Sequence, residues 1–273
     1  MTFDPALHPA PDSIRSRLWF LFHKDRILVR RGEEASVRPY FTDVSSVAAD
    51  LMHTQYLGCL NDTDCFAAEV PSATMVSAAA ELLQVRHLLG RVEEELAAVA
   101  GRANQMIHWA RTHQFCGRCG QPTRDGENER AKICQACGLV NYPRVSPAII
   151  VAVLNAGRIL LARSTRVGAH FYSVLAGFVE PGETLEECVS REIREEVGLS
   201  VTDIRYFGSQ PWPFPNALMV AFTARYARGE MRLNPTEIAA ADWFAAGALP
   251  PVPGRWSIAR RLIDWFEETN GRQ

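Results

Sequence analysis

Three glutamates in this sequence have a spacing that could bind a metal ion. Glu192, Glu195 and Glu196 stand at positions i, i+3 and i+4. Residues at that spacing are neighbours on a helix, so their carboxylate oxygens could converge on Mg²⁺ or Mn²⁺. The alternative is a surface acidic patch, or a set of salt bridges to nearby arginines.

The local sequence predicts the helix that would carry these glutamates. Thr184 and Glu187 form a capping box, and Gly198 provides a stop, so we expect a helix over residues 185–197. Its apolar face should consist of Leu185, Cys188, Val189, Ile193 and Val197.

Glu192 and Glu196 are expected within this apolar face and Glu195 at its edge, whereas Arg191 falls on the opposite side. Inward carboxylates are costly unless they are paired or bound to a cation. The arrangement therefore favours a metal site over a surface patch.

Four cysteines form a second chemical group, in two CxxC pairs separated by fourteen residues. The spacing of Cys116, Cys119, Cys134 and Cys137 is that of a zinc ribbon, in which thiolates fill a tetrahedral shell and the zinc is structural. A redox pair or unrelated buried thiols are the alternatives. Three glycines stand where the knuckle turns would need backbone freedom, namely Gly117, Gly120 and Gly138.

The predicted ribbon carries both signs of charge. Its basic residues are Arg118, Arg124, Arg130 and Lys132, and they are interrupted by Asp125, Glu127 and Glu129. An RNA-contacting role is one interpretation, and a stabilising brace between two domains is the favoured one.

Around these motifs the sequence predicts three parts: an N-terminal α+β domain over 1–110, the zinc ribbon over 111–143, and an α/β domain over 144–273. We expect helix-like sequence over 78–110 and an amphipathic helix over 258–266. The expected strands lie at 148–154, 158–162, 201–207 and 217–226.

The overall composition is that of an ordinary globular protein. The 273 residues include 29 basic and 31 acidic ones, so no global charge points to nucleic acid or a membrane surface. The N-terminus lacks the basic start and apolar run of a signal peptide, and the longest apolar run, 148–154, is too short to span a bilayer. We expect a cytoplasmic protein without a membrane partner.

The glutamate helix resembles a known motif. Gly177, Glu183 and the run from Arg191 to Leu199 match every defining position of the Nudix box. The resemblance implies an α/β/α sandwich that binds two or three Mg²⁺ or Mn²⁺ ions and hydrolyses a diphosphate. It also implies that Glu192 and Glu196 are metal ligands, that Glu195 is a ligand or base, and that Glu183 and Arg191 form a structural pair.

Residues 209–215, SQPWPFP, contain three prolines and two aromatic residues, which we interpret as a stiff loop presenting flat apolar surface. With the ribbon and the Nudix box, this segment resembles the NADH pyrophosphatase family. The resemblance implies hydrolysis of NADH, and less favourably NAD⁺, to nicotinamide mononucleotide and AMP by a homodimer with one structural Zn²⁺ per subunit.

The resemblance also implies further site residues. The Ala176 carbonyl and Glu237 would bind metal. The substrate contacts would be Arg86, Tyr142, Phe178, Gln210, Pro211, Trp212, Pro213, Phe214, Pro215, Asn216, Ala217 and Ala259. Where the family commonly has a serine after SQPWPFP, this chain has Asn216-Ala217, which leaves the substrate ranking open.

Two other functions compete with NADH hydrolysis. The same site could remove the NAD cap from the 5′ end of RNA. From another class, the chain could be a zinc-ribbon nucleic-acid-binding regulator whose Nudix domain senses a nucleotide. Three inward glutamates argue against a pure sensor.

Overall fold

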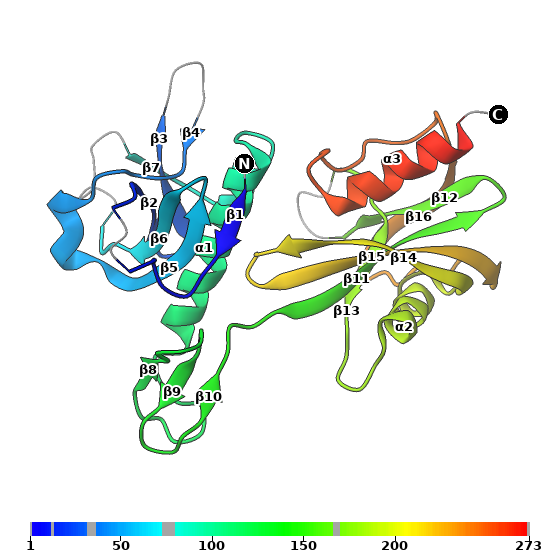
Figure 1. Ribbon diagram of the computed structural model, residues 1–273. Coiled ribbons are helices and arrows are strands. Elements are labelled where there is room, and N and C mark those ends of the chain that lie inside the picture. The colour runs from blue at the N-terminus through cyan, green and yellow to red at the C-terminus, as the bar shows by residue number, and fades with distance from the viewer. Residues whose placement is uncertain (1, 12–13, 32–36, 73–79, 166–169, 272–273) are drawn as a thin grey trace. The chain divides into compact units, whose positions relative to one another are not determined.

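A computed structural model describes residues 2–11, 14–31, 37–72, 80–165 and 170–271 of the chain, which divides into two compact units (Figure 1). Unit 1 contains residues Met1–Arg144 and Pro213–Asn216. Unit 2 contains Val145–Trp212 and Ala217–Gln273. Each unit has its own apolar core and is described by itself.

Unit 1 is built on a mixed sheet with the strand order β1-β5-β6-β2-β3-β4, to which β7 adds by pairing with β3. Its strands are β1 (Phe3–Pro5), β2 (Arg17–His23), β3 (Arg26–Arg31), β4 (Val37–Arg38), β5 (Met52–Leu60), β6 (Thr63–Glu69) and β7 (Ala80–Leu83). The helical elements are η2 (Ser45–Asp50), η4 (Val85–Leu88) and the long helix α1 (Glu94–Thr112).

Alternation along the strands places apolar residues on both faces of this sheet. Phe20 and Phe22 of β2 pack in one core cluster with Ala103 and Ile107 of α1. The intervening Leu21 packs on the other face with Phe41. The helix α1 therefore covers the face that carries Phe20 and Phe22.

The expected helix over 78–110 is wrong at its beginning. Residues 78 and 79 lie outside the described residues, and 80–83 form a strand that pairs antiparallel with β3. The helix itself begins at Glu94. Leu82 and Leu83 have apolar partners on the two sides of the sheet, so sheet pairing overrides their helix propensity.

The cysteine-rich part of unit 1 is a small three-stranded sheet. Its strands are β8 (Thr123–Asp125), β9 (Lys132–Cys134) and β10 (Val140–Asn141), in the order β10-β9-β8. One knuckle precedes β8 and the other follows β9, so short antiparallel pairing brings the two CxxC pairs together.

Unit 2 is an α/β/α sandwich. Its sheet has the order β14-β15-β11-β12-β16, with β13 pairing to β11. The strands are β11 (Ser146–Asn155), β12 (Arg158–Ser164), β13 (Leu175–Phe178), β14 (Ser200–Trp212), β15 (Ala217–Arg228) and β16 (Ile238–Ala245). Figure 1 shows α2 (Leu185–Val197) and α3 (Ile258–Asn270) on opposite faces of this sheet.

The alternating residues of β11 explain the two helical layers. Ile149 and Val151 pack with the apolar face of α2, whereas Ile150 and Ala152 pack with α3. A strand buried on both faces reads as a continuous apolar run, as residues 148–154 do. The predicted sandwich is confirmed.

The segment Ser209–Pro215 was expected to be a loop, and half of that expectation is wrong. Residues up to Trp212 continue β14 and pair with β15, and only residues 213–216 turn. Pro211 is tolerated because β14 ends the sheet order, where a missing N–H costs little. Within the described residues, no helix has both the length and the apolar character needed to cross a bilayer.

Candidate functional site

Helix α2 has the caps that its sequence predicts. The Thr184 hydroxyl accepts a hydrogen bond from the Glu187 N–H at 3.2 Å, and the Glu187 carboxylate accepts one from the Thr184 N–H at 2.8 Å. Gly198 ends the helix with a φ of 75°. These caps fix which residues of α2 face the sheet.

Two glutamates lie on the buried face of α2. Glu192 and Glu196 are 9% and 8% exposed, whereas the side chain of Glu195 is 53% exposed. Burial raises the pKa of Glu192, and the neighbouring Arg191 opposes that shift. The predicted inward orientation is confirmed.

Gly177 of β13 makes room for the Glu192 carboxyl group. A Cβ at position 177 would lie 1.8 Å from the carboxyl carbon of Glu192. Only a glycine leaves that space, so strand β13 and helix α2 together form a recess that holds this carboxylate against the backbone. The sequence did not reveal this role of Gly177, although the residue belongs to the Nudix box.

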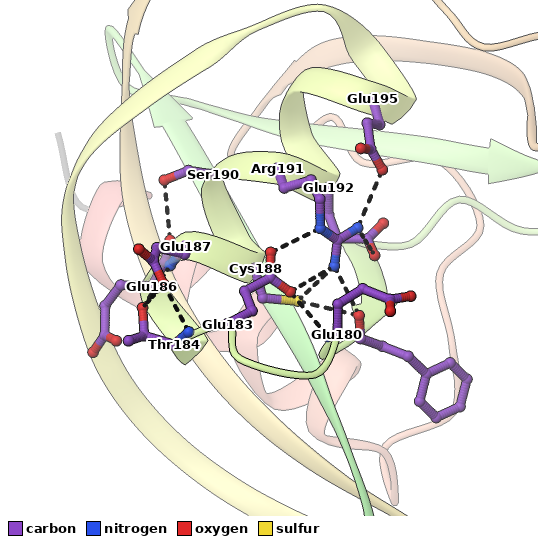
Figure 2. A network of polar contacts seen from close by, with 11 residues as sticks. Glu180, Glu183, Thr184, Glu186, Glu187, Cys188, Ser190, Arg191, Glu192 and Glu195 are labelled. Atoms are coloured by element: carbon purple, nitrogen blue, oxygen red, sulfur yellow. Dashed lines mark hydrogen bonds and ion pairs between the residues drawn. The ribbon is translucent and has the colours of Figure 1, made fainter.

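Arg191 is the centre of a carboxylate cluster (Figure 2). Its guanidinium donates two hydrogen bonds to Glu183, at 2.7 and 2.8 Å. It also donates to Glu192 at 2.8 Å, to Glu195 at 3.1 Å and to the Phe178 carbonyl at 2.9 Å. The expected pair of Arg191 with Glu183 is present. Arg191 was expected on the side of the helix opposite the apolar face, but its long side chain also reaches back to Glu192 and Glu195.

The Arg191 cluster has an excess of negative charge. One guanidinium contacts the carboxylates of Glu183, Glu192 and Glu195. The salt-bridge alternative is therefore realised in part, but a single positive charge does not balance three negative ones. Hard carboxylate oxygens with surplus charge suit a hard divalent cation.

Two further predicted metal ligands come from neighbouring segments. Glu237 lies close enough to raise the pKa of Glu192 by charge repulsion. Its segment is tied to α2, since the Asn234 N–H donates to the Glu196 carbonyl at 2.8 Å. Ala176 is an exposed residue of β13 directly before Gly177. The structure thus brings Glu237 toward the glutamates of α2.

The four ribbon cysteines converge more closely than the glutamates do. Their Sγ atoms all lie within 4.8 Å of one another, and within the described residues no other group of potential ligands converges in this way. The backbone N–H of Cys119 holds the pKa of the Cys116 thiol at about 6. A thiolate is the form that binds zinc, so the geometry supports a structural zinc site.

Backbone geometry supports two of the three predicted knuckle glycines. Gly120 and Gly138 have φ values of 73° and 71°, which L residues rarely adopt. Gly117 has no such φ, so its place in the first knuckle does not depend on glycine's backbone freedom.

Two of the four basic ribbon residues make internal contacts. Arg130 donates to the carbonyls of Tyr56 and Ala6, at 2.8 and 2.7 Å. Lys132 pairs with Asp125 at 2.7 Å and lies over the Trp109 ring. These contacts tie the ribbon to other parts of unit 1, whereas Arg118 and Arg124 are exposed. The brace between two domains stays a prediction.

Five of the predicted substrate contacts lie in unit 1 near α1 or in the turn that follows β14. Arg86, Phe214 and Pro215 line one cavity of about 360 Å³. Asn216 lines a neighbouring cavity. Pro213 packs on α1, where its carbonyl accepts a hydrogen bond from the Asn104 amide at 2.8 Å.

Tyr142 lies in the ribbon directly after β10 and is 57% exposed, with its hydroxyl donating to Glu129 at 2.9 Å. In unit 2, Phe178 is 59% exposed directly after Gly177. Both rings have the exposure that stacking on a base or nicotinamide ring requires.

The remaining predicted contacts of unit 2 lie around the start of α3. The Gln210 amide donates to the Trp256 carbonyl and accepts from the Ile258 N–H, both at 2.8 Å. Trp212 stacks on Trp256 with ring centroids 5.5 Å apart. Pro211 stays in the strand, whereas Ala217 and Ala259 are buried. Sequence reasoning missed Trp256, since nothing in its spacing marks it.

Comparisons with known proteins agree with this architecture. Three family models match in succession: "NADH pyrophosphatase-like rudimentary NUDIX domain" at residues 16–109, "NADH pyrophosphatase zinc ribbon domain" at 111–142 and "NUDIX domain" at 144–266. The chain is also 45% identical over 212 residues to the NAD-capped RNA hydrolase NudC of Deinococcus radiodurans, covering 76% of this chain and 75% of that protein. This chain belongs to the NADH pyrophosphatase family of Nudix hydrolases.

Other relatives match a shorter part. The NAD-capped RNA hydrolase NudC of Pseudomonas putida is 53% identical over 172 residues, which cover 63% of this chain and 62% of that protein. The chain thus spans less than two thirds of the length of this relative. A solved NUDIX hydrolase from Nitrosomonas europaea covers 59% of this chain and 94% of its own, with a TM-score of 0.51 and 21% identity, and it supports the fold.

Proposed function

We propose that the protein hydrolyses the pyrophosphate bond of NADH, and less favourably of NAD⁺, to nicotinamide mononucleotide and AMP. The observation that carries this proposal is the buried Glu192 carboxylate, held in the Gly177 recess beside a cluster with surplus negative charge. In the reaction, the oxygen of water bonds to one phosphorus, and the bridging oxygen leaves with the other phosphate.

Five groups would hold two or three Mg²⁺ or Mn²⁺ ions: Glu192, Glu195, Glu196, Glu237 and the Ala176 carbonyl. When bound, such ions offset the diphosphate charge and lower the pKa of the attacking water. Glu195, the most exposed of the three helix glutamates, is available to accept the proton. Glu183 fixes the Arg191 guanidinium, which in turn orients Glu192 and Glu195.

The variant Glu196→Gln tests the chemistry. We expect a loss on the order of 10³-fold in kcat, with folding and zinc content retained, because the amide has the size of the carboxylate but not its charge. Product analysis with Mg²⁺ or Mn²⁺ and NADH measures it. Near-normal turnover in the variant would exclude this mechanism, and an inactive wild type would favour the nucleotide-sensing regulator.

The same site would also remove the NAD cap from RNA. This second function is favoured by relatives that bear the name NAD-capped RNA hydrolase and by the two exposed ribbon arginines. A comparison of kcat/KM for NADH, NAD⁺, ADP-ribose and NAD-capped RNA ranks the substrates.

We also propose an oligomeric state and a cellular compartment for the protein. We expect a homodimer in the cytoplasm, where a reducing environment suits seven cysteines without a disulfide among them. Light scattering of the purified protein tests the dimer, and a monomer at working concentrations would contradict it.

A further inference from the structure

A cavity in unit 1 is lined mostly by residues that have no role in the proposed hydrolysis of a free dinucleotide, Asn216 being the exception. It has a volume of about 340 Å³ and lies between α1, the first ribbon knuckle and the residues after β10. None of the residues that line it is acidic. The lining includes Arg144, His108, His113, Phe115, Asn141 and Asn216.

The cavity holds one side chain with a permanent positive charge, that of Arg144. Burial and then the charge of Arg111 lower the pKa of His108, with Asp25 opposing them, which favours a neutral imidazole beside this guanidinium. Within the described residues, Arg144 has no ion pair, although the Gln105 amide donates to its carbonyl at 2.7 Å and ties its backbone to α1. A guanidinium in this setting favours an anionic ligand.

An exposed aromatic ring stands beside this charge. Phe115 is 64% exposed, and the Trp109 and His113 rings, which line the same cavity, have their centroids 6.2 Å apart. A ring with an open face next to a guanidinium is the arrangement that binds a base and its phosphate. A cavity of about 340 Å³ is at the small end of ligand sites, which suits one nucleotide.

The cavity adjoins the proposed cap contacts of the same unit. His108 lines both this cavity and the one formed by Arg86, Phe214 and Pro215. Asn216 follows Pro215 directly and lines the new cavity. A ligand seated against Arg86 and Phe214 could therefore extend past His108 without leaving unit 1.

We propose that this cavity binds the first nucleotide after the NAD moiety of a capped RNA. Arg144 contacts the phosphate that joins this nucleotide to the cap, and Phe115 stacks on its base. The inference rests on the proposed function, since it extends the substrate of that site. A capped RNA would then gain contacts in unit 1 that a free dinucleotide lacks.

The test compares three substrates: NADH, NAD carrying one 3′-linked nucleotide, and NAD-capped RNA. Arg144→Gln and Phe115→Ala should each lower kcat/KM for both extended substrates about tenfold, because a charged hydrogen bond and a base stack are each worth this much. NADH hydrolysis should stay unchanged. Arg38→Gln, which removes an exposed arginine of β4 in unit 1 outside the cavity, is the matched control and should leave all three rates unchanged.

Three results would overturn the proposal: an equal loss on NADH, no loss on any substrate, or a loss confined to the longer RNA. A binding measurement separates this inference from the proposed function. On a Glu196→Gln background, Arg144→Gln should weaken binding of the one-nucleotide substrate and flatten its salt dependence. Equal affinity with and without Arg144 would contradict the inference, whereas a wild type that binds but does not hydrolyse would contradict only the function.

Discussion

The Glu192 carboxylate occupies the recess at Gly177 only because residue 177 has no side chain. A methyl group at residue 177 would overlap the end of the Glu192 side chain, which is flexible and can move away. We therefore predict that Gly177→Ala keeps the fold but lowers kcat about 100-fold, the cost of a misplaced group. NADH turnover and circular dichroism measure the two effects.

Gly208 provides the matched control for this substitution. A Cβ at Gly208, also in unit 2, meets no atom within 4 Å, and its φ is not in the left-handed region. Gly208→Ala should retain activity. Equal activity losses in both variants would show that a general disturbance of the sheet, and not Glu192, is responsible.

Glu183 gives a pH-dependent prediction. Hydrogen bonds from Arg191 lower its pKa from 4.5 to about 2. Because the pKa of Glu183 is lower in the folded protein than in the unfolded chain, its carboxylate stabilises the fold at pH values above 4.5. This contribution to the free energy of unfolding is lost as the pH falls toward 2. We expect Glu183→Gln to lower the melting temperature at neutral pH and to match the wild type near pH 2. Thermal unfolding across this range is the measurement, and a constant difference at all pH values would contradict the assignment.

The inward glutamates could be predicted because helical spacing fixes which Cα atoms face the core. The direction of Arg191 could not, because a long side chain can reach back around the helix that carries it. The role of Gly177 was also hidden, since it depends on how closely β13 approaches α2. The spacing of residues along a helix predicts which face of the helix each residue occupies, whereas the side-chain contacts depend on tertiary packing.

At the scale of elements, helices with strong local signals were predicted well and strands with weak ones were not. α2 runs over the residues that its caps indicate. β7 was expected to be helical. The strand was missed because its partner, β3, lies far away in the sequence. The proline-rich end of β14 was expected to be a loop, because nothing local shows that β14 is an edge strand. Strand identity depends on partners that one sequence does not reveal.

The ribbon is the element whose stability should depend on metal. Each CxxC pair contributes two thiols, and losing one leaves an incomplete shell. Cys119→Ser should reduce the zinc content and lower the melting temperature by roughly 5–10 °C. Cys59→Ser is the control, because Cys59 lies in β5 outside the cluster. Purified wild-type protein without zinc would contradict the zinc assignment.

At the scale of the whole molecule, one short segment belongs to a different compact unit from its neighbours along the chain. Residues 213–216 join β14 to β15 of unit 2, yet they pack with unit 1. Phe214 joins the apolar cluster around α1. Substrate contacts proposed for this turn therefore depend on a helix that precedes the Nudix domain in sequence.

The contact between α1 and this turn gives a prediction that separates binding from stability. A Cβ at Gly101 would lie 2.7 Å from the rigid ring of Pro213, so Gly101→Ala should push the turn away from α1. Alanine favours a helix over glycine by about 1 kcal/mol, so the helix itself should not weaken. We expect a raised KM for NADH with kcat little changed. Asn104→Ala, which removes the hydrogen bond to the Pro213 carbonyl, should act in the same direction. Steady-state kinetics of both variants measure this, and an unchanged KM in both would show that the turn does not contact substrate.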